Sequence, residues 1–66
     1  MTTQARALER IKRIAEAKCE RDADHFESEA MGYLAALHDE GLLPEADYAR
    51  LMNTLRTQRM TWRKSA

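Results

Sequence analysis

One break interrupts an otherwise continuous helical pattern in this chain of 66 residues. It is the segment Gly41-Leu42-Leu43-Pro44, which holds the only proline and one of the two glycines. Glycine at a helix end readily adopts a positive φ, and proline is favoured where the next helix begins. Because two helices joined by a short turn pack side by side, the break predicts an antiparallel helical hairpin.

The segment before the break predicts one long helix, from about residue 3 to about residue 40. Only Gly32 weakens the pattern, at a cost of about 1 kcal/mol relative to alanine. At 1.5 Å per residue such a helix would be about 55 Å long, more than a compact domain of this size needs. The apolar residues that share one stripe of this helix are Leu8, Ala15, Cys19, Ala23, Phe26, Ala30, Tyr33, Leu34 and Leu37.

The segment after the break predicts a second helix, from about residue 44 to about residue 63. Glu45 and Asp47 would lie in its first turn, where the helix dipole favours negative charge. Its length of about 30 Å is too short to cover the first helix, so roughly the first 20 residues of the chain would lack an intramolecular partner. The apolar stripe of this second helix contains Tyr48, Leu51, Met52, Leu55 and Trp62.

We therefore expect an all-α fold, with residues 1–66 forming a single domain. A domain this small has a marginal core and often depends on disulfides, a metal or oligomerisation. The single cysteine, Cys19, cannot form an intramolecular disulfide, and no Cys/His pair has zinc-ligand spacing, so we expect no metal and no cofactor. A homodimer is predicted instead, either as a helical bundle or as a coiled coil of the two uncovered segments.

The uncovered segment up to Cys19 is predicted to bind a second copy or another protein. It carries apolar residues on two neighbouring stripes, so its apolar surface is wider than one helix contact uses. The predicted interface contains Leu8, Ile11, Ile14, Ala15 and Cys19. An alternative docking patch lies at the C-terminal end and contains Met60, Trp62, Arg63 and Lys64, although Trp62 could instead pack in the core opposite Ala23.

Charge is segregated along the chain although the total is zero. Residues 1–18 carry a net charge of +3, residues 19–47 carry −8, and residues 48–66 carry +5. Within the first block, Arg6, Arg10 and Arg13 form one basic row along the predicted helix. Such a row could contact the phosphates of a nucleic acid or an acidic partner, and the alternative is a solvated face with no ligand.

The residues around the break also resemble a known protein family. The stretch from Leu34 to Tyr48, LAALHDEGLLPEADY, resembles the short C-terminal (SHOCT) domain, in which a helix ends in glycine and two aliphatic residues before an acidic-aromatic pair and a second helix. Pro44 replaces the usual threonine, and Asp47-Tyr48 stands where Glu-Phe is common. The resemblance covers about residues 30–56 and implies a short oligomerisation or docking module without enzymatic activity.

No set of residues resembles a catalytic constellation, so we do not expect an enzyme. Asp22, His25 and Glu29 have the spacing of half a metal site on a helix, and the alternative is that His25 simply pairs with Glu29. The first residues lack the apolar stretch of a signal peptide, and no run approaches the roughly 18 apolar residues of a membrane span. A cytoplasmic protein that does not contact a membrane is therefore expected.

Two functions remain open from the sequence. In the first, the chain is a protein-interaction and oligomerisation module that acts as a regulator or inhibitor. In the second, it is a dimeric nucleic-acid-binding regulator that uses Arg6, Arg10 and Arg13. A phage or plasmid accessory protein would suit either role, while the partner and the pathway cannot be read from the residues.

Overall fold

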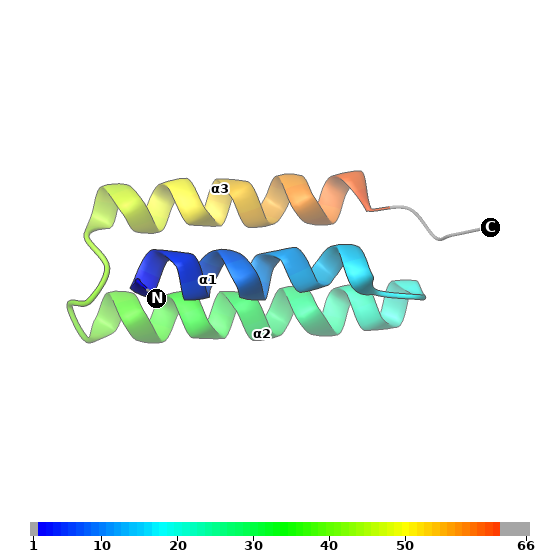
Figure 1. Cartoon of the computed structure of the whole chain (residues 1–66), viewed down its shortest axis with the longest axis horizontal. Helices are drawn as coiled ribbons and strands as arrows, with labels where there is room; N and C mark the ends of the chain where they lie inside the picture. The colour runs from blue at the N-terminus through cyan, green and yellow to red at the C-terminus, as the bar shows by residue number, and fades with distance from the viewer. Residues whose placement is uncertain (1, 63–66) are drawn as a thin grey trace.

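The structure is a computed structural model that describes residues 2–62. These residues form an all-α bundle with no β-strand in the described range, which confirms the all-α part of the prediction. The first and third helices run in one direction and the second runs in the opposite direction, and each helix contacts the other two (Figure 1). The elements are α1 (Thr3–Lys12), the 3₁₀ helix η1 (Arg13–Glu16), α2 (Glu20–Asp39) and α3 (Glu45–Thr61).

The long first helix predicted over about residues 3–40 is wrong. Helical structure stops after η1, where Ala17 has an extended ψ of 138° and Cys19 has φ −148° and ψ 166°. The chain turns back there, so that α1 and η1 pack on both α2 and α3 (Figure 1). Burying a large aliphatic side chain contributes about 1.5–3 kcal/mol, so burying Ile11 and Ile14 outweighs the helical hydrogen bonds lost at the break.

The core lies where the three helices meet. Ile11 and Ile14, from α1 and η1, are 1% and 0% exposed, and Leu34 of α2 and Leu55 of α3 are 0% and 1% exposed. The expectation that the first 20 or so residues lack an intramolecular partner is therefore wrong. The other buried residues of this core are Ala7, Ala17, Ala23, Ala30, Leu43 and Leu51.

The turn between α2 and α3 has the chemistry that its sequence predicts. Gly41 adopts a φ of +74°, in the left-handed region that glycine reaches without strain. The N–H of Leu42 donates to the Leu37 carbonyl at 3.0 Å, and the N–H of Gly41 donates to the His38 carbonyl at 3.0 Å. These two bonds satisfy carbonyls at the end of α2, and Pro44 stands directly before the first residue of α3.

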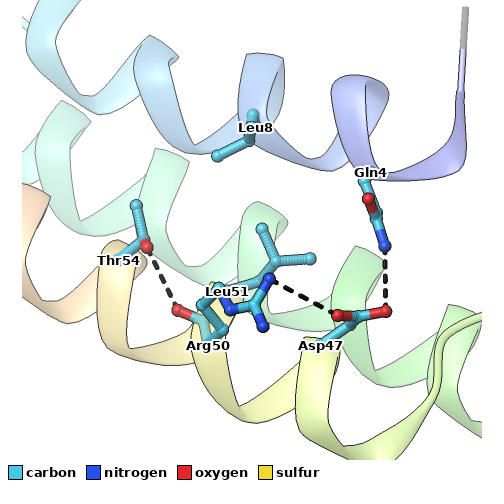
Figure 2. Close-up of a pocket in the computed structure, with 6 residues that line it drawn as sticks. All are labelled: Gln4, Leu8, Asp47, Arg50, Leu51 and Thr54. Atoms are coloured by element: carbon cyan, nitrogen blue, oxygen red, sulfur yellow. Dashed lines mark hydrogen bonds and ion pairs between the residues drawn. The ribbon is translucent and has the colours of Figure 1, made fainter.

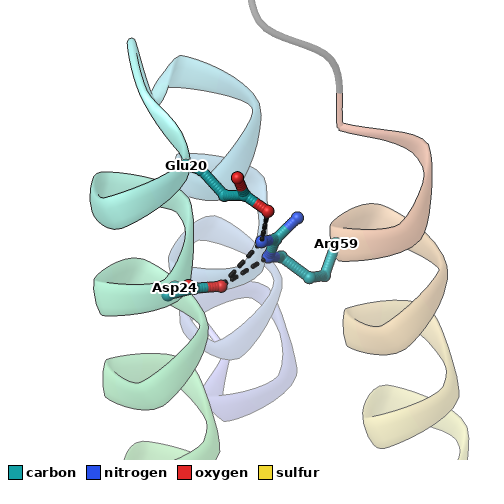
Figure 3. Close-up of polar contacts among 3 residues, drawn as sticks. All are labelled: Glu20, Asp24 and Arg59. Atoms are coloured by element: carbon teal, nitrogen blue, oxygen red, sulfur yellow. Dashed lines mark hydrogen bonds and ion pairs between the residues drawn. The ribbon is translucent and has the colours of Figure 1, made fainter.

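Side-chain contacts join α2 and α3 at both ends. Near the turn, the rings of His38 and Tyr48 meet edge to face with centroids 4.4 Å apart. At the far end, Nε and Nη2 of Arg59 donate to Oδ1 of Asp24 at 3.0 and 2.7 Å, and Nη2 lies 3.6 Å from Oε1 of Glu20 (Figure 3). The hydrogen bond with Asp24 raises the pKa of Arg59 above its ordinary value, so the guanidinium stays protonated.

Two hydrogen bonds tie the first part of the chain to α3. At one end of the bundle, Nε2 of Gln4 donates to Oδ2 of Asp47 at 2.9 Å (Figure 2). At the other end, the indole N–H of Trp62 donates to the carbonyl of Ala17 at 3.1 Å. Ala17 directly follows η1, so this hydrogen bond connects the end of α3 to the segment where the predicted long helix is interrupted.

Candidate functional site

The candidate site is the basic side of α1 that borders α2. We call it the basic surface and define it by Arg6, Glu9, Arg10 and Arg13 of the first segment and Tyr33 of α2, which line one open hollow. Three arginines and one glutamate give these residues a formal charge of +2. A shallow hollow of this kind suits an anionic ligand that approaches from solvent rather than one enclosed in a cavity.

The helical period places the three arginines on this surface. Their positions are separated by four and three residues, so their side chains leave the same side of the helix about one turn apart. The residue that follows each arginine is buried in the core, which fixes the direction in which the arginines leave the helix. These buried residues are Ala7, Ile11 and Ile14.

Arg10 is held in place by an aromatic ring. Its guanidinium carbon lies 4.8 Å from the ring centroid of Tyr33, and both side chains are half-buried. Arg6 and Arg13 are exposed on either side of it. Within residues 2–62 none of the three arginines forms an ion pair with a carboxylate, so their hydrogen-bond donors are open to a ligand.

The structure separates the residues that were predicted to form an oligomer or partner interface. Ile11 and Ile14 lie in the core, while Leu8 is 36% exposed, Ala15 is exposed and Cys19 is half-buried. The five residues therefore do not form one exposed surface, which corrects that prediction. The physical reason is the break after η1, which gives the two isoleucines partners inside the chain. Homodimerisation itself stays a prediction.

A second hollow lies between α1 and α3 (Figure 2). Leu8 and Leu51 form its apolar part. Its polar groups already contact one another, since Asp47 accepts a hydrogen bond from Gln4 and lies 3.6 Å from Nη1 of Arg50. This groove therefore offers a ligand fewer open polar groups than the basic surface. Its lining residues are Gln4, Leu8, Asp47, Arg50, Leu51 and Thr54.

The predicted C-terminal docking patch is only partly described. Met60 is 75% exposed, whereas Trp62 is half-buried and bonded to the Ala17 carbonyl. The guanidinium of Arg59 also lies 5.6 Å from the centre of the Trp62 ring. Trp62 thus packs against the core of the chain, next to the end of η1. Arg63 and Lys64 lie outside the described residues.

The residues with metal-site spacing on α2 do not converge on a common point. Nε2 of His25 lies 2.8 Å from Oε2 of Glu29, so the simple pairing of these two side chains is confirmed. No group of three potential metal ligands occurs among the residues that the structure describes. In the same part of the chain, no helix has the length and the apolar character needed to cross a bilayer.

Tyr33 is a member of the site that the sequence does not predict. In a single long helix, Tyr33 belongs to the apolar stripe and lies far from Arg10. The contact exists only because α1 folds back along α2. Comparison of the chain with protein-family models, with curated proteins and with solved structures gave no match. The chemistry of the basic surface is therefore the basis for any functional proposal.

Proposed function

We propose that this protein is a non-enzymatic interaction module that binds an acidic segment of a partner protein on its basic surface. The supporting observation is that Arg6, Arg10 and Arg13 share one hollow and form no ion pair within residues 2–62. Arginine binds a carboxylate through two parallel hydrogen bonds, and Arg10 is already ordered by Tyr33. Ordering before binding reduces the conformational entropy that binding costs.

The basic surface suits a protein segment better than a nucleic acid because it is small. The three arginines span only about 10 Å along α1, and Glu9 lies among them. Residues 20–39, which form α2 beside this surface, carry a net charge of −5 with histidine neutral. A nucleic acid that makes six to ten phosphate contacts would extend past the arginines and meet this like charge.

Binding of this kind is the action of a small regulator or inhibitor in the cytoplasm. The resemblance of residues 30–56 to the SHOCT domain implies the same class of role. A homodimer would present two basic surfaces and raise the avidity for a partner with two acidic segments. Light scattering over a range of concentrations tests that part, and a constant mass of 7.6 kDa excludes the homodimer.

A direct test measures the binding of a fluorescently labelled polyglutamate peptide by anisotropy at 50 and 200 mM salt. The triple substitution Arg6→Ala, Arg10→Ala and Arg13→Ala should weaken binding by about 3- to 150-fold, since each exposed charge pair contributes about 0.2–1 kcal/mol and three pairs contribute about 0.6–3 kcal/mol. It should leave the helical circular dichroism unchanged, because the arginines are outside the core.

The matched control removes three positive charges elsewhere, at the exposed residues Lys18, Arg21 and Arg56. The control variant, with alanine at these three positions, should bind the peptide with an affinity within about twofold of that of the unsubstituted protein at 200 mM salt, where charges farther apart than about 8 Å are screened. Equal weakening by both triples would reject the basic surface as the site. Binding of generic duplex DNA or single-stranded RNA without binding of the peptide would favour the nucleic-acid function instead.

A further inference from the structure

We infer that the acidic segment is an α-helix that lies in the groove between α1 and α2, with its carboxylates aligned with the three arginines. This inference rests on the proposed function and adds the conformation and the residue spacing of the partner. It depends on three features of the basic surface: the spacing of the arginines, the shape of the groove and the contact between Arg10 and Tyr33.

The spacing of the arginines matches the repeat of a second helix. Steps of four and three residues, from Arg6 in α1 to Arg13 at the start of η1, correspond to about 6 and 4.5 Å along the helix axis. Carboxylates at intervals of three and four residues on a partner helix have the same spacing, in either chain direction. Three residues on one face of a β-strand span about 13 Å, compared with about 10.5 Å for the arginine row. A helix can therefore engage all three arginines from a single straight face.

The shape of the groove also favours a helix. The hollow is lined from both α1 and α2, two neighbouring antiparallel helices (Figure 1). A further helix can pack onto such a pair at an interaxial distance of about 8–10 Å, as in helical bundles, with its carboxylates toward α1 and its uncharged residues toward α2, whose residues 20–39 carry a net charge of −5. No side-chain hydrogen bond or ion pair joins α1 to α2 within residues 2–62, whereas Gln4 and Asp47 bridge the groove between α1 and α3. The groove between α1 and α2 is thus the more open of the two.

Arg10 is the central anchor in this arrangement. It occupies the middle of the row, its guanidinium carbon lies over the ring of Tyr33, and its N–H groups form no ion pair within residues 2–62. Arg6 and Arg13 are exposed and adjust to the carboxylates on either side. The contact with the middle carboxylate should therefore depend on the aromatic ring of Tyr33 as well as on the charge of Arg10.

Two labelled peptides of identical composition test the inference. The first has glutamates at alternating intervals of three and four residues among alanine and glutamine, which makes an acidic helical face. The second contains the same residues with glutamate at every second position. Anisotropy at 100 mM salt should show the first peptide binding about tenfold more tightly, with a gain of helical circular dichroism in the complex. A version of the first peptide with two internal prolines should lose this advantage.

Variants of the protein assign the preference to the anchor. Arg10→Ala should reduce the difference between the two peptides to about twofold or less, while Lys12→Ala, on the same helix but outside the hollow, should retain it. Tyr33→Leu should reduce the difference severalfold, and Tyr33→Phe should retain it because the ring remains beneath Arg10.

The two levels of the proposal fail in different ways. If both peptides bind equally and both lose binding in the triple arginine variant, the helical partner is refuted while the acidic-segment function stands. If neither peptide binds at low salt, both are refuted. If Arg10→Ala retains the full preference for the helical peptide, the assignment of Arg10 as the anchor is overturned.

Discussion

Replacing Ile14 with alanine distinguishes the observed bundle from the long hairpin that the sequence predicts. In the bundle, Ile14 is 0% exposed and packs in the core shared by the three helices. On the uncovered helix of a monomeric hairpin the same side chain would be in contact with solvent, and replacing it would change stability by only about 0.5 kcal/mol. One substitution therefore has two very different expected costs.

The magnitude follows from the atoms removed. Isoleucine to alanine deletes three side-chain carbons, and about 0.8 kcal/mol for each buried carbon gives about 2.4 kcal/mol. The cavity left behind adds to this, and measured core substitutions of this type cost about 2–5 kcal/mol. We therefore expect a loss of about 3 kcal/mol. A domain of 66 residues has a total stability of about 3–10 kcal/mol, so this loss is a large part of it.

Urea unfolding followed by circular dichroism at 222 nm measures this loss. Leu8→Ala is the matched control, because it deletes the same number of carbons from a side chain that is 36% exposed, and it should cost about 1 kcal/mol. Ile14→Val should cost about 1 kcal/mol and keeps the prediction measurable where the alanine variant is unfolded. Equal and small losses for Ile14→Ala and Leu8→Ala would refute the packing of the first segment against α2 and α3.

The other predictions concern backbone and surface positions. Gly41→Ala should lower the free energy of unfolding by about 1 kcal/mol, because the φ of Gly41 is +74°. Gly32→Ala, in the interior of α2, should raise the free energy of unfolding by about 0.5–1 kcal/mol in the same urea assay. An added Cβ meets no atom within 4 Å at either glycine, so the two variants isolate the effect of backbone conformation. Arg59→Ala should lower the free energy of unfolding slightly in the urea assay, with a smaller loss in 1 M salt, whereas Arg56→Ala should have no measurable effect. Trp62→Phe removes the indole hydrogen bond, which contributes about 0.5–1.5 kcal/mol to the free energy of unfolding, and should therefore lower the thermal midpoint. An unchanged midpoint would show that this bond contributes nothing to stability.

Features that depend on local chemistry could be predicted from the sequence. The positive φ of Gly41 and the start of α3 after Pro44 follow from the conformations that these two residues favour. The break at Ala17–Cys19 has no such signal, because it contains neither glycine nor proline. Its residues could continue a helix, and the burial of Ile11 and Ile14 against distant parts of the chain decides the outcome instead.

The charge pattern did contain information about this break. The step from a basic to an acidic block lies at Lys18–Cys19, within one residue of the start of α2. Arg10 and Lys12 lie in the last turn of α1, and Glu20 and Asp22 lie in the first turn of α2. Each pair has the charge that the nearby helix end favours, so the change from basic to acidic residues marks the end of one helix and the start of the next.

The same break changes the kind of partner that α1 can bind. An apolar interface required Ile11 and Ile14 at the surface, and both are in the core. What α1 offers beside α2 is charged, so binding there should be fast, steered by charge and weakened by salt. An apolar dimer interface would respond in the opposite way, because added sulfate strengthens the burial of apolar surface. Measuring the affinity of the chain for its partner at increasing salt concentration therefore tests whether binding uses the charged basic surface or an apolar interface.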